Sequence, residues 1–206
     1  MNKGLYLYPI IIRLWHFLNA VLIIALILTG LSMQYSDPAQ PVIRFDKAVT
    51  LHNISGIALA INYLLFIIGN TISGNAKQYR IRLEGLLGRL CRQFRYYTVD
   101  IFKGREAPFP VTKKSKFNPI QQVTYFLIMF IFMPVLFISG LSLLYSGAAI
   151  RQLFGVKAVF YTDILHLIIG FCLSIFLIVH LYFCTIGTKP LKNFKSIITG
   201  YHEDGH

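Results

Sequence analysis

The sequence predicts an all-α integral membrane protein built as a bundle of four membrane-spanning helices. Apolar residues make up 55% of the chain and charged residues only 14%, whereas soluble domains carry about 25% charged residues. Four apolar stretches are long enough to cross a bilayer, which takes about 20 residues each. The charged residues gather in the gaps between these stretches. The pattern excludes a disordered chain, a nucleic-acid-binding domain and an ordinary soluble enzyme, despite a net charge of +12.

The four apolar stretches define the predicted spans within one membrane domain, residues 1–206. They lie at about 10–33, 48–72, 119–145 and 159–186. The first span has the position of a secretory signal, but Arg13 lies inside it and no small-residue cleavage site follows it. Signal peptides have a shorter apolar region and such a cleavage site. We therefore expect the first span to be retained as a helix.

The distribution of lysine and arginine predicts which side each loop faces. Sixteen of the twenty lie at the N-terminal end, in the loop 73–118 or in the tail after the fourth span, and four lie in the two short loops. Loops rich in these residues stay on the cytoplasmic side of a membrane. We expect both termini and the long loop to face the cytoplasm, and the two short loops to face the opposite side.

The long loop contains an amphipathic pattern of its own. Apolar residues recur there every three or four positions, which is the spacing of one helix face: Leu83, Leu87, Leu90, Phe94, Tyr97 and Ile101. Arginines occupy much of the opposite face. The pattern predicts a cytoplasmic amphipathic helix that lies on anionic lipids. The alternative is a docking surface for a cytoplasmic partner.

The deeper ionisable groups of the spans are four histidines: His16, His52, His166 and His180. An ionisable residue inside a membrane is costly and marks a functional site by default. With the predicted orientation, His16 and His180 lie toward the cytoplasmic side, and we call them the inner pair. His52 and His166 lie toward the opposite side, and we call them the outer pair.

Two pairs at two depths are the arrangement that two stacked haem groups require. His166 and His180 are 14 residues apart, which puts both rings on one helix face about 21 Å apart along the axis. Haem iron takes axial imidazole ligands, and each pair supplies two of them at one level. The three cysteines form no CxxC motif, so covalently attached c-type haem is not expected. We therefore expect non-covalent haem b.

Other roles for the four histidines remain open at this point. A zinc or copper site would need its ligands at one level. A transporter or channel with a histidine proton relay would usually also carry Asp or Glu within the spans, and these spans contain no Glu. A histidine can also be purely structural. Glycines near the histidine levels, such as Gly30, Gly56, Gly140 and Gly170, suit close packing of a flat ring or of neighbouring helices.

The chain resembles the four-helix dihaem cytochrome b subunits of formate dehydrogenase-N, thiosulfate reductase and nickel–iron hydrogenase. The resemblance covers nearly the whole chain. Its segments are R-L-W-H-F at 13–17, T-G-L at 29–31, H-N-I-S-G at 52–56, N-P-I-Q at 118–121, L-H-L-I-I-G at 165–170, H-L-Y at 180–182 and F-K-S-I-I-T-G-Y at 194–201.

The resemblance implies a function in the bacterial inner membrane. In this family a quinone, often menaquinone, reacts near the inner haem, and the polar residues before the third span contribute to that site; here they are Asn118 and Gln121. Ile120 stands where relatives tend to have Gly. The implied partner is a periplasmic-side redox subunit, an iron–sulfur protein or a multihaem cytochrome c.

Asn118 followed by Pro119 is also the pattern of a helix N-cap.

Arg13 lies one turn before His16. We expect its guanidinium to pair with a propionate of the inner haem, or to reach the membrane surface as a positive anchor. The chain shows no bond-making catalytic constellation, so the expected role is that of an electron-transfer subunit within a multi-subunit oxidoreductase.

Overall fold

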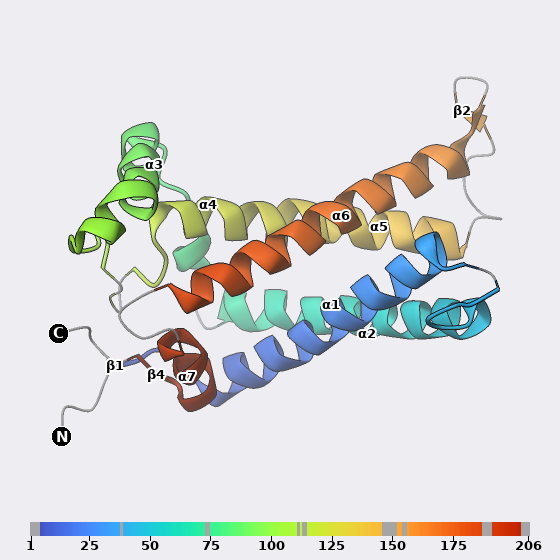
Figure 1. Ribbon diagram of the computed structural model, residues 1–206, viewed down its shortest axis with the longest axis horizontal. Helices are drawn as coiled ribbons and strands as arrows, with labels where there is room; N and C mark the ends of the chain where they lie inside the picture. Colours follow the sequence, from blue (N-terminus) through green and yellow to red (C-terminus); the bar gives the residue numbers. More distant parts are fainter. Residues whose placement is uncertain are drawn as a thin grey trace. The chain divides into compact units, whose positions relative to one another are not determined.

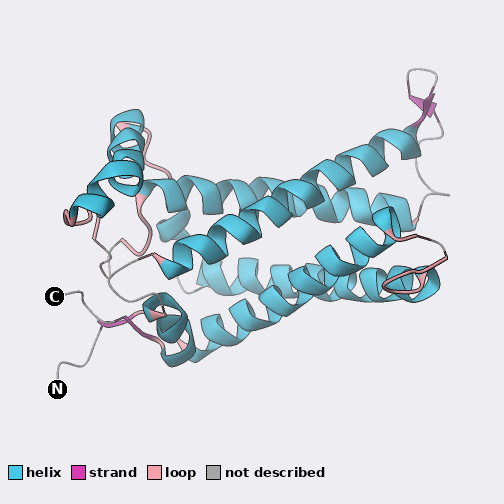
Figure 2. Ribbon diagram, in the orientation of Figure 1, coloured by secondary structure: helices cyan, strands magenta, loops and turns pink. Residues whose placement is uncertain are grey.

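The computed structural model describes residues 5–37, 39–72, 75–110, 112, 115–145, 152–153, 156–186 and 191–202. The chain divides into two compact units. The first unit joins Met1–Ile67 to Pro134–His206, and the second is Ile68–Met133. Helices dominate both units (Figures 1 and 2).

Four helical segments are long and apolar enough to cross a membrane, as the sequence predicted. They are α1 (Ile10–Tyr35), α2 (Phe45–Ile72), the run Pro119–Leu144 and α6 (Ala158–Thr185). The run consists of α4 (Pro119–Leu127), a π-helical turn η4 (Ile128–Phe132) and α5 (Met133–Leu144). The predicted ends differ by at most three residues. The second span begins earlier than predicted because its first turn contains Asp46 and Lys47, which an apolar window leaves out.

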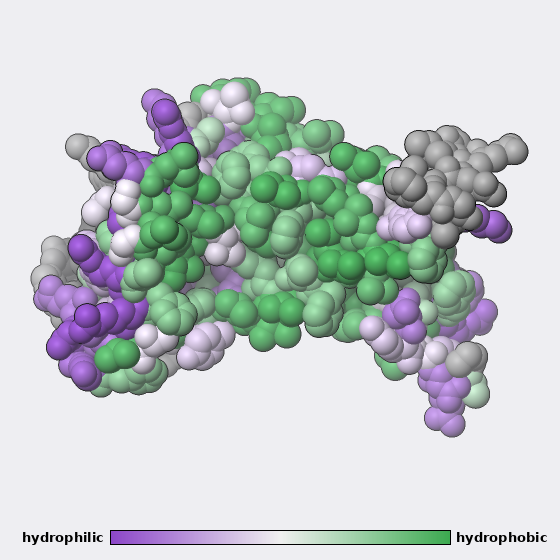
Figure 3. All heavy atoms as spheres, turned by 90° about the horizontal axis from the view of Figure 1, so that it is seen from above, coloured by the Kyte–Doolittle hydropathy of each residue, from purple (hydrophilic) through white to green (hydrophobic). Residues whose placement is uncertain are grey.

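The helices of the first unit expose large apolar side chains. Ile11 is 77% exposed, Phe17 70% and Ile178 68%, and the exposed surface of the long helices is mostly hydrophobic (Figure 3). Such a surface would aggregate in water but is the expected surface in contact with lipid tails. The few fully packed apolar side chains of this unit include Leu59 and Leu173.

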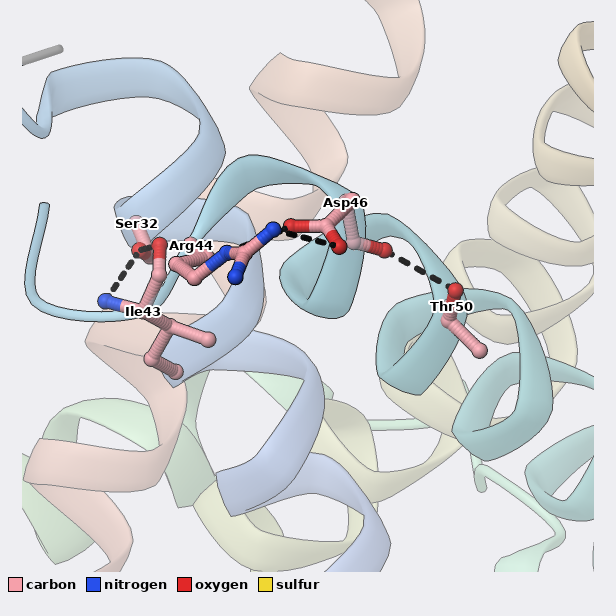
Figure 4. A network of polar contacts seen from close by, with 5 residues as sticks. All are labelled: Ser32, Ile43, Arg44, Asp46 and Thr50. Carbon is pink, nitrogen blue, oxygen red and sulfur yellow. Dashed lines mark hydrogen bonds and ion pairs between the residues drawn. The ribbon is translucent and has the colours of Figure 1, made fainter.

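The turn between α1 and α2 is fixed by polar contacts (Figure 4). The Ser32 hydroxyl donates to the carbonyl of Ile43 at 3.1 Å and accepts from its amide at 3.2 Å. Arg44 donates to both carboxylate oxygens of Asp46, at 3.2 and 3.3 Å, and Thr50 donates to the Asp46 carbonyl at 2.9 Å. These bonds set how α2 starts, and His52 lies in its second turn.

The second unit holds the predicted amphipathic helix. Its elements are η1 (Asn75–Tyr79), α3 (Leu86–Arg95), a π-helical turn η2 (Tyr96–Asp100), a 3-10 turn η3 (Ile101–Lys103) and the start of the third span. Regular α-geometry is therefore shorter than the apolar pattern, and the helical segment ends at Gly104, whose φ is 67°. Leu87 is 78% exposed and Phe94 64%, which suits a helix lying on a membrane surface.

A short helix and a strand pair close one end of the first unit. Strand β1 (Leu5–Tyr6) pairs antiparallel with β4 (Tyr201–His202), and α7 (Lys192–Thr199) precedes β4. Gly200 ends α7 with a φ of 87°, and a Cβ there would lie 2.7 Å from the Tyr8 carbonyl oxygen. Only glycine fits this position. A second pair joins β2 (Gln152–Leu153) to β3 (Val156–Lys157).

Candidate functional site

The outer pair lies between α2 and α6 in the first unit. The ring centroids of His52 and His166 are 6.3 Å apart. Each ring has a hydroxyl partner: Thr29 Oγ1 lies 2.9 Å from His52 Nδ1, and Ser139 Oγ lies 2.9 Å from His166 Nδ1. α1 supplies the first hydroxyl and α5 the second. Four helical segments thus contribute to this one level of the bundle.

The inner pair lies between α1 and α6 in the same unit. The ring centroids of His16 and His180 are also 6.3 Å apart. Phe176 stacks on His180 with centroids 5.7 Å apart and an interplanar angle of 23°. Cys184 Sγ lies 3.9 Å from His180 Nε2, a weak contact one turn further along α6.

The spacing within each pair fits one metal ion. A metal–imidazole bond is about 2.0–2.1 Å and its nitrogen lies about 1.1 Å from the ring centre, so two axial imidazoles on one ion have centroids about 6.2–6.4 Å apart. Both pairs fall within this range. Among the described residues, no three His, Cys, Asp or Glu gather into a group that would hold an ion by themselves. A metal ion held by only two imidazoles at one level would need a cofactor to fill its remaining coordination positions.

Arg13 extends to the end of α7. Its Nε donates to the carbonyl of Ile197 at 3.2 Å, and Nη2 donates to the carbonyl of Ile198. These carbonyls lie in the last turn of α7, where the helix dipole favours a cation. This role was not predicted from the sequence. A guanidinium has five N–H donors, so the predicted contact with a haem propionate stays a prediction.

Asn118 and Gln121 form a capping box in the second unit. Asn118 Oδ1 accepts from the Gln121 amide at 3.0 Å, and Gln121 Oε1 accepts from the Asn118 amide at 3.1 Å. Pro119 is the first helical residue, so the N-cap pattern is confirmed. Asn118 Nδ2 donates to the Tyr97 hydroxyl oxygen at 2.8 Å. Burial raises the pKa of Tyr97, against smaller effects of its hydrogen bonds, so the phenol keeps its proton at neutral pH.

Comparison with known proteins supplies the family. A model described as prokaryotic cytochrome b561 matches residues 7–200. The chain is also 37% identical over 201 residues to a protein named "Putative cytochrome YdhU" from Escherichia coli (strain K12), across 98% of this chain and 76% of the relative. The chain belongs to the prokaryotic cytochrome b561 family. This cytochrome is therefore a multi-pass protein of the bacterial inner membrane. No solved structure matches it.

The family implies haem b, and the residues around the outer pair fit that group. Gly30 and Gly140 each face one of the two rings: a Cβ on Gly30 would lie 3.5 Å from His52 Cε1, and one on Gly140 would lie 3.1 Å from His166 Cε1. The absence of side chains there lets the rings lie against α1 and α5. Neutral imidazoles held by neutral hydroxyls in an apolar bundle would suit haem iron as ligands.

The hydroxyls that contact the outer histidines, and the contact of Tyr97 with the capping box, were not predicted from the sequence. The signal for two of them was present, since a hydroxyl residue directly precedes a glycine at 29–30 and again at 139–140. Tyr97 was assigned only to the apolar face of its helix. Asn193 was also missed: its Nδ2 donates to the carbonyls of Cys184 and Ile186 at 3.2 and 3.3 Å, which attaches α7 to the end of α6.

Proposed function

We propose that this cytochrome binds two haem b groups, one at each histidine pair, and passes electrons across the membrane between a redox subunit and a quinone. The observation that carries the proposal is the equal 6.3 Å spacing of two pairs whose members on α6 are about 21 Å apart along the helix axis. That separation takes up most of the roughly 30 Å hydrocarbon core of a bilayer.

A bound haem and the protein would contribute different parts of the electron transfer. Haem, when bound, supplies one-electron exchange between two states of its iron. His52 and His166 would hold one group, and His16 and His180 the other. The surrounding apolar helices exclude water and provide a low-dielectric environment, which tunes the potential of a bound haem. Moving one electron across the membrane changes its free energy by about 2.3 kcal/mol for each 100 mV of membrane potential.

The distribution of basic residues supports a side of the membrane for each segment. Sixteen of the twenty basic residues belong to the termini and the loop 73–118, which supports a cytoplasmic location for these segments. The outer pair then lies toward the periplasm. Resemblance to the membrane subunits of multi-subunit oxidoreductases supports a periplasmic-side partner there, an iron–sulfur protein or a multihaem cytochrome c.

A quinone, most simply menaquinone, is proposed to react at the cytoplasmic side with Asn118 and Gln121 taking part. The side-chain oxygens of Asn118 and Gln121 accept hydrogen bonds within the capping box. The side-chain NH₂ groups of these two residues are therefore the groups that can donate. Asn118 directs its amide to the Tyr97 hydroxyl, whose proton is retained at neutral pH. Amide and phenol donors suit the carbonyl oxygens of a quinone.

Reduction of the purified chain by a quinol tests this function. We expect a short-chain menaquinol analogue to produce the visible spectrum of reduced haem b, and Asn118→Ala to slow this reduction while dithionite still reduces the variant fully. Gln122→Ala is the matched control, because Gln122 lies on the same helix and donates instead to the carbonyls of Gln78 and Arg80. A coloured protein that quinol cannot reduce would contradict the quinone part. A colourless protein would contradict the haem part and favour the transporter alternative.

A further inference from the structure

Two buried hydroxyls occupy matching places at the outer pair. Thr29 and Ser139 are each only 3% exposed. Each oxygen lies 2.9 Å from the Nδ1 atom of one histidine of the pair, and each is followed in the chain by the glycine that faces the same ring. The two hydroxyls come from different helices. The same arrangement is therefore built twice, from two unrelated parts of the chain.

Each hydroxyl has a single hydrogen, and a backbone carbonyl of its own helix lies within hydrogen-bond distance. Thr29 Oγ1 lies 2.7 Å from the Ala25 carbonyl, and Ser139 Oγ lies 2.8 Å from the Val135 carbonyl. If each hydroxyl donates to this carbonyl of its own helix, its lone pairs face the histidine. In that arrangement Nδ1 carries the hydrogen of the neutral imidazole. Nε2 keeps its lone pair and is the nitrogen left for a metal.

We propose that Thr29 and Ser139 are positioning residues that hold His52 and His166 in the Nδ1–H tautomer and lower the reduction potential of the outer haem. The inference rests on the proposed function, because it needs a haem at this pair. A partner that accepts the Nδ1 hydrogen raises the basicity of the ligand. A more basic ligand stabilises the oxidised iron, which lowers the potential. The two bonds form a short chain from imidazole to hydroxyl to carbonyl, and such chains strengthen cooperatively.

An ordinary structural role would look different. Serine and threonine inside membrane helices often donate to the carbonyl one turn earlier and do nothing else. Ser174 on α6 shows this pattern, with its hydroxyl 2.9 Å from the Gly170 carbonyl. Ser174→Ala therefore removes a back-bonded hydroxyl from the same bundle and serves as the matched control.

The test is a redox titration of the haem absorbance in the His180→Ala background, where only the outer haem is expected. Thr29→Val keeps the shape of the side chain and removes its hydroxyl, and Thr29→Ser keeps the hydroxyl. We expect the potential to rise in Thr29→Val and in Ser139→Ala. Thr29→Ser and Ser174→Ala should titrate as the background protein does.

Two results would overturn the proposal: an unchanged potential in Thr29→Val, or an equal shift in Thr29→Ser, which would assign the effect to packing. If Thr29→Val loses the haem altogether, retention of haem by Thr29→Ser supports the hydroxyl's role and its loss there contradicts it. Failure of the proposed function is a separate result. It would appear as absence of haem from the His180→Ala background protein itself, before any hydroxyl is changed.

Discussion

The outer and inner histidine pairs have the same ring spacing but are held by different contacts. Neutral hydroxyls on two other helices fix the outer rings at their Nδ1 atoms. At the inner pair, His180 stacks on Phe176 and lies near a cysteine sulfur. The same ligand type in two environments is a means of giving two haems different potentials. In the proposed function, such a difference in potential would favour one direction of electron flow between the two haems.

The strongest test of this comparison is to remove one ligand from each pair. We expect His166→Ala to lose the outer haem and keep the inner one, and His180→Ala to do the reverse. In each variant the haem content should fall from about two per chain to about one. Optical redox titration should then show one wave, at a different potential in each variant. Loss of both haems in both variants would mean that the pairs do not bind independently.

Crowding at a glycine should affect only the outer pair. A Cβ on Gly140 would lie 3.1 Å from the His166 ring, closer than ordinary contact, whereas one on Gly30 would lie 3.5 Å from the His52 ring. Overpacking of this kind costs about 1–3 kcal/mol. Thermal loss of the haem spectrum should therefore occur at lower temperature in Gly140→Ala than in Gly30→Ala. Equal sensitivity of the two variants would show that the ring can move away.

The stacking contact should affect only the inner pair. Phe176→Leu keeps apolar volume on α6 but removes a ring stacked on His180, and such pairs contribute about 0.5–1.5 kcal/mol. We expect a small shift in the potential or spectrum of the inner haem. The remaining outer haem in a His16→Ala background provides the control, and a shift there would show that the effect is not local.

The smallest effect concerns the link between α1 and α7. Arg13→Gln removes a cation from the carbonyls at the end of α7, an interaction of about 0.3–1 kcal/mol. Proteolysis of the segment after residue 191 should be moderately faster, while the outer haem titrates as before. A pronounced loss of inner haem with unchanged proteolysis would instead favour the predicted propionate contact.

Much of this architecture could be predicted from the sequence because a bilayer imposes simple rules. Apolar length predicted the spans, and helical rise placed the histidines at two depths; the structure brings together His16 with His180 and His52 with His166. Whether these residues ligate haem iron stays a prediction. The hydroxyl partners could not be predicted in the same way. Their role depends on how each span is rotated about its axis, and hydropathy does not reveal this in helices that are apolar on every side.

The other residues that were missed have the same explanation. Asn118 was predicted as an N-cap from its own neighbours, but its bond to Tyr97 joins positions 21 residues apart. Arg13 has its partners 184 and 185 residues away. Local patterns reveal caps and faces, whereas partners distant in the chain depend on the fold.

Each histidine pair is proposed to bind one haem. The ratio of extracted non-covalent haem to protein tests this in the detergent-purified chain, produced in cells with ample haem supply. We expect about two haems per chain, since each iron would take two imidazoles. A ratio of about one would mean that one pair does not bind haem, and the absence of haem would contradict the proposed function.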